Sequence, residues 1–143
     1  MSSEVKIAGH GGCVVLSADG YENPDAWDRG DANWLSCGVQ LTLGGVAATH
    51  RTSFTTNDFA RFLEQLRSVM ATLKGVALFE TDEDALSIKV ELGGRGTGTV
   101  SGVLRIAEHI RATVEFSFES DQTFLLRTIA DLDGLCREFP IKA

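Results

Sequence analysis

The sequence predicts an α+β fold in which a mostly antiparallel sheet of about eight strands bends over two amphipathic helices. Three observations lead to this prediction. Apolar and polar residues alternate in several segments, which is the pattern of half-buried strands. Two longer segments carry apolar residues at helical spacing instead. Short turns join most neighbouring strand segments, and hairpins make the strands that they connect antiparallel.

The first strands are predicted near the N-terminus and around a glycine turn. Short strands are expected around residues 5–7 and 13–16. A clearer alternation follows, in which every second residue is apolar: Leu35, Cys37, Val39, Leu41 and Leu43. Gly44-Gly45 then fits a two-residue turn of the primed type, because glycine adopts positive φ at both central positions without steric cost. This turn places His50 opposite Val39, on the apolar side of the pair.

A first helix is predicted from about residue 56 to 74, because apolar residues there recur at helical spacing. The apolar stripe comprises Phe59, Phe62, Leu63, Leu66, Val69, Met70 and Leu73. Thr55 and Asp58 match a capping box in which Asp replaces the usual Glu. Gly75 follows the stripe, at the position where a helix commonly ends in a left-handed residue.

Four further strand segments follow this helix: "VALFET", "ALSIKVEL", "GTVSGVLRIA" and "IRATVEFSFE". The acidic turn at residues 82–84 joins the first two. Residues 93–98 are glycine-rich, but strands on both sides predict a hairpin loop and not a phosphate-binding loop. A three-residue loop at 107–109 aligns Leu104 with Ala112 in the last hairpin.

The final helix is predicted to begin after Ser120 or Asp121, either of which can cap it, and to end at Phe139-Pro140. The sequence shows no internal repeat and no linker that divides the chain. Residues 1–143 are therefore expected to form one α+β domain. An acidic, tryptophan-containing insertion loop interrupts that domain at about residues 19–33.

Charge and hydropathy limit the classes of partner. The net charge is −7 and the pI is near 4.9, whereas binding to nucleic acid depends on clustered Lys and Arg. Nucleic acid is therefore not an expected partner, and a basic protein surface is. The chain has no run of about 18 apolar residues and no secretory signal pattern, so no membrane partner and a cytoplasmic location are expected.

The sequence offers no recognisable catalytic, cofactor or metal site. The three cysteines are odd in number and far apart, which fits buried, reduced thiols better than a disulfide frame or a zinc site: Cys13, Cys37 and Cys136. The three histidines lie on separate elements without metal-ligand spacing: His10, His50 and His109. The acidic loop does not meet the template of a calcium-binding EF-hand. We therefore expect a protein that is not an enzyme and holds no cofactor.

The insertion loop and the strand start after it carry the candidate partner-binding residues. These combine carboxylates with aromatic rings: Tyr21, Glu22, Asp25, Trp27, Asp28, Asp31 and Trp34. In one interpretation the tryptophans fold over the sheet edge as a lid and the acids only solvate the loop. In the other, aromatic anchors ringed by carboxylates bind a basic protein. Strand alternation sends Trp34 to the polar face, which favours the second. Asn33 is expected to hold the loop where it joins that strand.

Three short motifs resemble the recurring pattern of WapI-type bacterial immunity proteins and related domains. They are "AWDRGDANWL" at residues 26–35, "ESDQTFL" at 119–125 and "CREFP" at 136–140. The resemblance implies a small cytoplasmic protein that binds and neutralises a cognate toxin, often a nuclease, delivered by neighbouring cells. It does not imply an interface, so the candidate residues rest on the local argument.

The leading hypothesis is an antitoxin-like immunity protein that covers the active site or substrate groove of a basic toxin without catalysis. Mimicry of nucleic-acid charge is one means of doing so. The alternative is a small-ligand-binding module, or an enzyme, with a cavity between the sheet and the helices near His50. The sequence leaves the toxin, the binding surface and the oligomeric state open.

Overall fold

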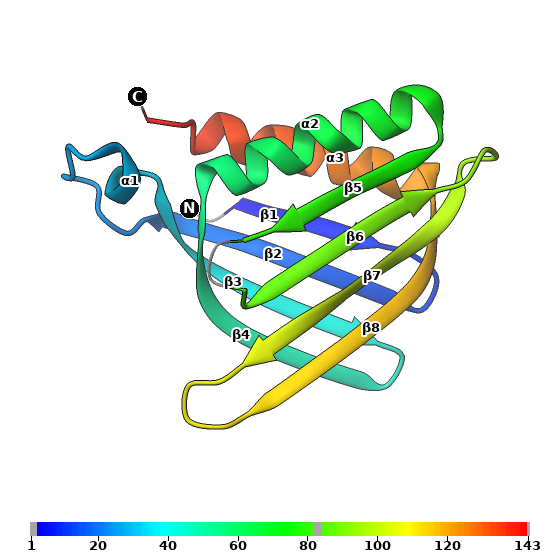
Figure 1. The fold of residues 1–143 in the computed structure, drawn as a ribbon, viewed down its shortest axis with the longest axis horizontal. Coiled ribbons are helices and arrows are strands. Elements are labelled where there is room, and N and C mark those ends of the chain that lie inside the picture. The colour runs from blue at the N-terminus through cyan, green and yellow to red at the C-terminus, as the bar shows by residue number, and fades with distance from the viewer. Residues whose placement is uncertain (1–2, 82–83, 143) are drawn as a thin grey trace.

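The structure is a computed structural model that describes residues 3–81 and 84–142, and it contains two four-stranded antiparallel sheets. The first sheet comprises β1 (Ser3–Ala8), β2 (Gly12–Tyr21), β3 (Trp34–Leu43) and β4 (Val46–Thr55), in that spatial order. The second comprises β5 (Gly75–Glu80), β6 (Leu86–Leu92), β7 (Thr97–Ile106) and β8 (Ala112–Asp121). The helices are α1 (Arg29–Ala32), α2 (Thr56–Thr72) and α3 (Gln122–Glu138). The predicted α+β class, with antiparallel strands and two long helices, is confirmed (Figure 1).

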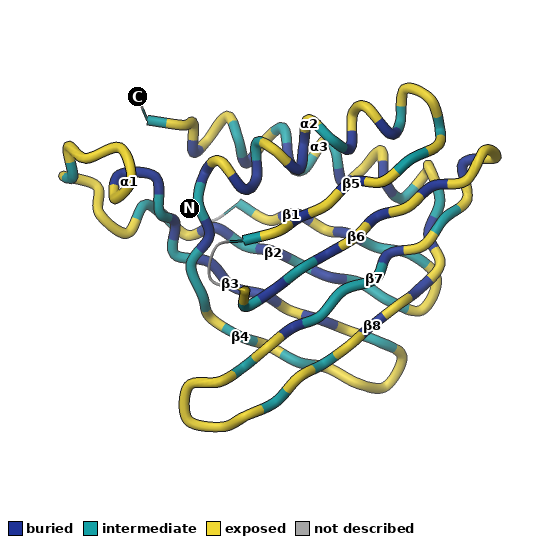
Figure 2. The backbone as a smooth tube through the Cα atoms, viewed as in Figure 1, coloured by how far each residue is buried: buried dark blue, intermediate teal, exposed yellow. Residues whose placement is uncertain are grey.

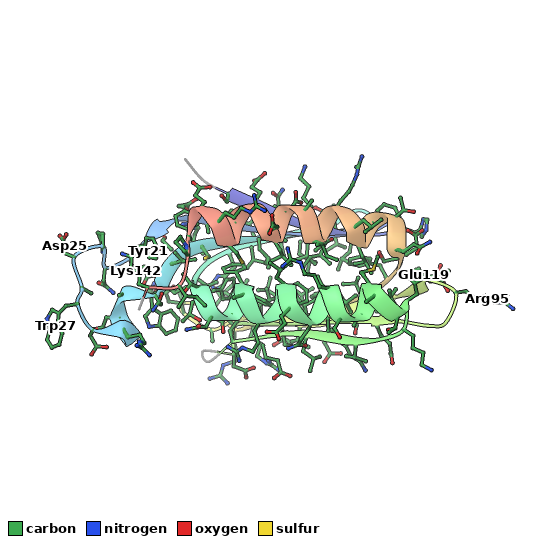
Figure 3. All side chains as sticks on the ribbon, turned by 90° about the horizontal axis from the view of Figure 1, so that it is seen from above. Tyr21, Asp25, Trp27, Arg95, Glu119 and Lys142 are labelled. Carbon is green, nitrogen blue, oxygen red and sulfur yellow. The ribbon has the colours of Figure 1, made fainter. Side chains whose placement is uncertain are left out.

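The strand order repeats although the sequence shows no repeat. Strands β1 to β4 precede α2, and strands β5 to β8 precede α3, so that four strands and a long helix occur twice. Helix α2 packs beside β5, and α3 packs beside β1. Each long helix thus covers the first strand of the other half. The two helices lie next to each other along one side of the sheets (Figures 1 and 3).

Aromatic rings fill the space between the sheets and the long helices. Phe79 of β5 contacts Phe54 of β4 at 5.1 Å and Phe62 of α2 at 5.5 Å between ring centroids. Phe59 of α2 joins them, and all of these rings are fully buried. Burying each ring contributes about 1.5–3 kcal/mol. Figure 2 shows the buried positions alternating along the strands, as the sequence pattern predicts.

The predicted register of the β3–β4 hairpin is confirmed. Leu43 pairs with Val46, and Val39 pairs with His50. The turn differs in one detail from the prediction, because only Gly44 of the two central glycines has positive φ, at 57°. Positive φ at the first central residue alone is the pattern of a type II′ turn.

The predicted register of the β7–β8 hairpin is wrong by two residues. Leu104 pairs with Val114, not with Ala112, and the connecting loop spans residues 107–111. Because side chains alternate with a period of two, this shift leaves the same residues on the buried face. Hydrophobic pattern therefore does not distinguish the two registers. Ile110, expected in the strand, is 63% exposed in the loop.

The long helices begin as predicted, and one of them ends differently. Thr55 and Asp58 form the predicted capping box of α2, whereas its left-handed terminal residue is Leu73 with φ of 56°. Gly75 was expected there and instead begins β5. Asp121 caps α3 by accepting hydrogen bonds from two backbone N–H groups. Ser120, the other predicted cap, donates to the carbonyl of Ala8 at 2.7 Å.

The acidic turn and the cysteines were also predicted from the sequence. The acidic turn predicted at residues 82–84 lies partly outside the described residues, since only Asp84 is described. The three cysteines are free thiols in the structure. Burial raises the pKa of Cys37 to about 12 from its ordinary value of 9.0, which keeps that thiol protonated. Cys13 and Cys136 are half-buried, so the prediction of burial holds fully for Cys37 alone.

Candidate functional site

The loop between β2 and β3 projects from one end of the molecule and contains the short helix α1 (Figure 1). Asp28 caps α1 by accepting a hydrogen bond from the N–H of Gly30 at 2.7 Å. Asn23 donates its side-chain amide to the carbonyl of Asp31 at 3.3 Å. These local bonds give the loop a defined shape. Most of its residues are exposed (Figure 2).

The two tryptophans of the site lie in different environments. Trp27 is 96% exposed, and its ring points away from the body of the molecule, as does Asp25 (Figure 3). Trp27 therefore does not fold over the sheet as a lid. Trp34 is half-buried at the start of β3, where it lines a groove of about 350 Å³ with Arg29 and Arg61.

Tyr21 is engaged inside the protein, although the sequence predicts it as a partner-binding residue. Its hydroxyl donates a hydrogen bond to the carbonyl of Pro140 at 2.6 Å. The ammonium of Lys142 lies 3.9 Å from the centre of the Tyr21 ring (Figure 3). Phe139 packs edge-on against the same ring, with 5.6 Å between the ring centroids. Burial raises the pKa of Tyr21. Tyr21 thus holds the segment after α3 against the base of the loop.

Asn33 ties the loop to the start of α2 and to the C-terminal segment. Its amide nitrogen donates to the carbonyls of Arg29 at 2.8 Å and Lys142 at 3.0 Å. Its amide oxygen accepts hydrogen bonds from the hydroxyl of Thr56 at 2.8 Å and the N–H of Lys142 at 2.7 Å. The residue is only 2% exposed, so these bonds satisfy a buried polar group. The predicted holding role of Asn33 is confirmed.

Two acidic residues at the C-terminal end of β2 contact the outer face of the first sheet. Asp19 forms an ion pair with Arg51 of β4 at 2.5 Å, and Arg51 also donates to the hydroxyl of Ser36 at 3.0 Å. Ser53, the next outward-facing residue of β4, donates a hydrogen bond to the carboxylate of Glu22. The loop is therefore anchored to β4 by polar contacts. Arg51 and Ser53 are site residues that the hairpin register could have identified, since it places both on the polar face.

Asp25, Asp28 and Asp31 are exposed and lie close to Trp27 in the sequence. Arg29 is the basic residue among them, and no ion pair joins it to a carboxylate in the described part of the chain. Charges exposed to water are screened over about 10 Å at ordinary salt. These carboxylates therefore exert their charge only over short distances.

Among the described residues, the space next to His50 differs from the cavity between sheet and helices that the alternative function requires. Fully buried apolar side chains fill the space between sheets and helices. His50 is half-buried on β4, and it lines two open grooves of about 360 Å³ and 580 Å³ on the outside of the molecule. Within the described residues, no group of three or more His, Cys, Asp or Glu side chains could hold a metal ion. In the same residues, no helix is long and apolar enough to cross a membrane.

Comparison with known protein families places the chain. A model of the Immunity protein WapI-like family matches residues 6–140, and the chain belongs to this family. The family resemblance carried by the three short motifs is thus confirmed. Membership supports an immunity role that implies binding of a cognate toxin, and it suggests a role without catalysis.

Structural comparison gives a match of a different kind. The structure of the plant transcriptional regulator PBF-2 is similar, with a TM-score of 0.55 over 97% of this chain and 82% of that chain. The sequence identity is 10%, so the similarity concerns the fold alone. No curated protein matches the chain at the level required for a relationship.

Proposed function

We propose that this protein neutralises a cognate bacterial toxin by binding it through the loop between β2 and β3. The exposed indole of Trp27 is the observation that supports this most directly, because a lone tryptophan that is 96% exposed lacks the burial that its large apolar surface favours. In protein complexes, tryptophan is enriched among the residues that dominate the binding energy. Asp25, Asp28 and Asp31 are exposed on the same loop, and in this proposal they form the charged rim of the interface.

The acidity of the loop and of the whole chain supports the proposal that the toxin binds through a basic surface. The net charge is −7, and complementary charge accelerates the encounter of two proteins. A nuclease is the toxin class that we propose, since a protein that grips phosphates carries clustered Lys and Arg around its active site. The immunity protein would then occupy that basic surface and exclude the substrate. Binding in the cytoplasm is part of the proposal.

Within this surface the residues have different roles. Trp27 is the proposed anchor, and the carboxylates beside it guide approach. Trp34 adds a half-buried ring at the edge of the groove next to α1. Tyr21 and Glu22 act indirectly, because both are already bonded to other parts of the protein and hold the loop in position.

Co-expression with the toxin encoded next to the gene tests the proposal. Cells that produce the toxin should survive with the wild-type protein and die with a variant that carries Trp27→Ala, Asp25→Lys and Asp31→Lys. The matched control reverses charge on the other sheet, at Glu80 and Glu115, which are exposed on β5 and β8. Equal protection by both variants would show that the loop is not the binding surface.

A further inference from the structure

Three of the four sheet edges are already occupied by other parts of the protein. On β1, the carbonyl of Lys6 accepts a hydrogen bond from Thr128 of α3 at 2.8 Å, and the N–H of Lys6 donates to Asp131 at 3.1 Å. On β5, the N–H of Leu78 donates to the side chain of Gln65 of α2 at 2.8 Å. The long helices thus use polar side chains to satisfy the edge that each one covers.

The edge strand β8 is occupied in a different way. The N–H of His10 donates to the carbonyl of Glu119 at 2.7 Å, in an isolated bridge between the β1–β2 turn and β8. Glu115 and Glu119 are exposed along the same strand. Charged residues on an edge strand disfavour the addition of another strand.

The remaining edge, β4, is long and lacks these protections. It has ten residues, and its ionisable side chains are those of His50 and Arg51. In an antiparallel hairpin closed by a two-residue turn, the pair that flanks the turn exchanges both backbone hydrogen bonds, and every second pair does so after it. The register therefore points the N–H and C=O groups of four residues away from β3: Ala47, Thr49, Arg51 and Ser53. In the described residues, no hydrogen bond reaches these groups from the outer side.

A groove follows this open edge. Residues 50–53 form one wall, and the opposite wall comes from the turns at the near end of the second sheet, with Asp84, Arg105 and Glu108. Its volume is about 580 Å³. The open backbone of β4 thus borders this groove, and an extended peptide that adds to a sheet edge bonds to such a backbone.

Carboxylates lie on both sides of the open edge. Asp19 and Glu22 contact β4 on the outer face, and Asp84 and Glu108 line the groove on the other side. Arg51 pairs with Asp19 at 2.5 Å and Arg105 with Asp84 at 3.1 Å, so within the described residues Glu22 on one side and Glu108 on the other are the carboxylates without a basic partner. An added strand would direct its side chains alternately to these two sides. Basic side chains on either face would therefore meet carboxylates.

We propose that a basic, extended segment of the toxin adds to β4 as a fifth strand of the first sheet. This inference rests on the proposed function and specifies its binding mode. Main-chain hydrogen bonds to residues 47–53 supply affinity, and the flanking carboxylates select basic side chains. The loop between β2 and β3 contacts the toxin beside the same edge, because Glu22 is bonded to Ser53. A second copy of the chain would bring equal negative charges together at this edge and is the less favoured occupant.

A proline at Thr49 tests strand addition without disturbing the fold. The N–H of Thr49 points outward, so proline removes a donor that β3 does not use, and proline is tolerated on edge strands. Thr49→Val is the matched control, since it removes the hydroxyl and keeps the N–H. Binding of the purified toxin is measured by biolayer interferometry, with the melting temperature of each variant alongside. We expect Thr49→Pro to weaken affinity by about tenfold or more and Thr49→Val by less than about threefold.

Hydrogen exchange gives a second measurement that needs no variant. On toxin binding, the amides of Ala47, Thr49 and Arg51 should exchange more slowly, while exchange on the outer face of the second sheet stays unchanged.

Wild-type affinity of Thr49→Pro together with unchanged exchange on β4 would overturn strand addition. If Trp27→Ala still abolished binding in that case, the proposed function would stand by itself. A toxin that does not bind the wild-type protein would overturn both proposals. Dimers of the free protein that Thr49→Pro dissociates would assign the edge to a second copy instead.

Discussion

Asn33 and Lys142 are joined by two hydrogen bonds although 109 residues separate them in the sequence. The amide group of Asn33 accepts from the backbone N–H of Lys142 and donates to its carbonyl, as a neighbouring strand would. The same side chain reaches Arg29 in the loop and Thr56 at the start of α2. One buried amide therefore fixes three segments relative to one another.

Replacement of Asn33 by Ala should destabilise the protein. The substitution removes the hydrogen bonds that the side chain of Asn33 makes with the buried hydroxyl of Thr56 and with the backbone N–H and C=O of Lys142, so we expect the free energy of unfolding to fall by about 2 kcal/mol. Urea denaturation measures this change. The matched control is Asn23→Ala, because Asn23 also bonds a loop carbonyl but is exposed. A loss for Asn23→Ala as large as that for Asn33→Ala would contradict the assigned role.

Tyr21→Phe should loosen the C-terminal segment and leave the core intact. The variant loses the hydrogen bond to Pro140 and keeps the ring that Lys142 and Phe139 contact. A single hydrogen bond of this type contributes about 1 kcal/mol. Hydrogen exchange of the amides of Phe139, Ile141 and Lys142 should become faster while exchange in β6 is unchanged. Unchanged exchange at residues 139–142 would argue that the ring contacts alone hold the segment.

Cys37 should resist alkylation and make the protein less stable at alkaline pH. With a folded-state pKa of about 12, the thiolate is present in about one molecule in ten thousand at pH 8. The unfolded thiol loses its proton near its ordinary pKa of 9.0, so stability is full below pH 9 and falls as pH rises toward 12. Iodoacetamide labelling and urea titrations at several pH values measure both effects. Cys37→Ala should reduce this alkaline slope without removing it, because the pKa values of Cys13, Cys136 and Tyr21 are also raised.

Charge reversal in the loop should act on the rate of toxin association. Asp25→Lys with Asp31→Lys removes carboxylates that are exposed, so the folded state should be unaffected. We expect slower association and a weaker dependence of that rate on salt, because rim charges act mainly on the encounter. Stopped-flow kinetics at several salt concentrations provide the measurement. An unchanged salt dependence would show that these carboxylates do not face the toxin.

The tryptophans should act on the rate of dissociation instead. Trp27→Ala removes an exposed ring, so the melting temperature should stay within about 1 °C of wild type while dissociation becomes about tenfold faster or more. Trp34→Ala should also speed dissociation, with some loss of stability because this ring is half-buried. Surface plasmon resonance separates the two rates. An effect of Trp27→Ala on association alone would contradict an anchoring role.

Local sequence was sufficient for most of the secondary structure. The alternation in β3, the glycine turn and the capping box of α2 each depend on residues within a few positions of one another, and all appear in the structure. Such local signals do not distinguish two strand registers that differ by two residues, which is the period of side-chain alternation. The β7–β8 register was therefore wrong by two residues, since both registers bury the same face. The left-handed end of α2 at Leu73 was likewise not visible in the sequence.

For the candidate site too, some features could be predicted from the sequence and others only from the tertiary structure. The composition of the loop by itself showed an acidic, aromatic surface, and the short motifs showed the family. Only the tertiary structure decided which of these residues face solvent. It placed Trp27 outside and engaged Tyr21 with Pro140, because the chain after α3 returns to the base of the loop. It also separated the strands into two sheets and left β4 as the open edge. These outcomes depend on contacts between residues far apart in the chain, for which periodicity, turns and caps carry no signal.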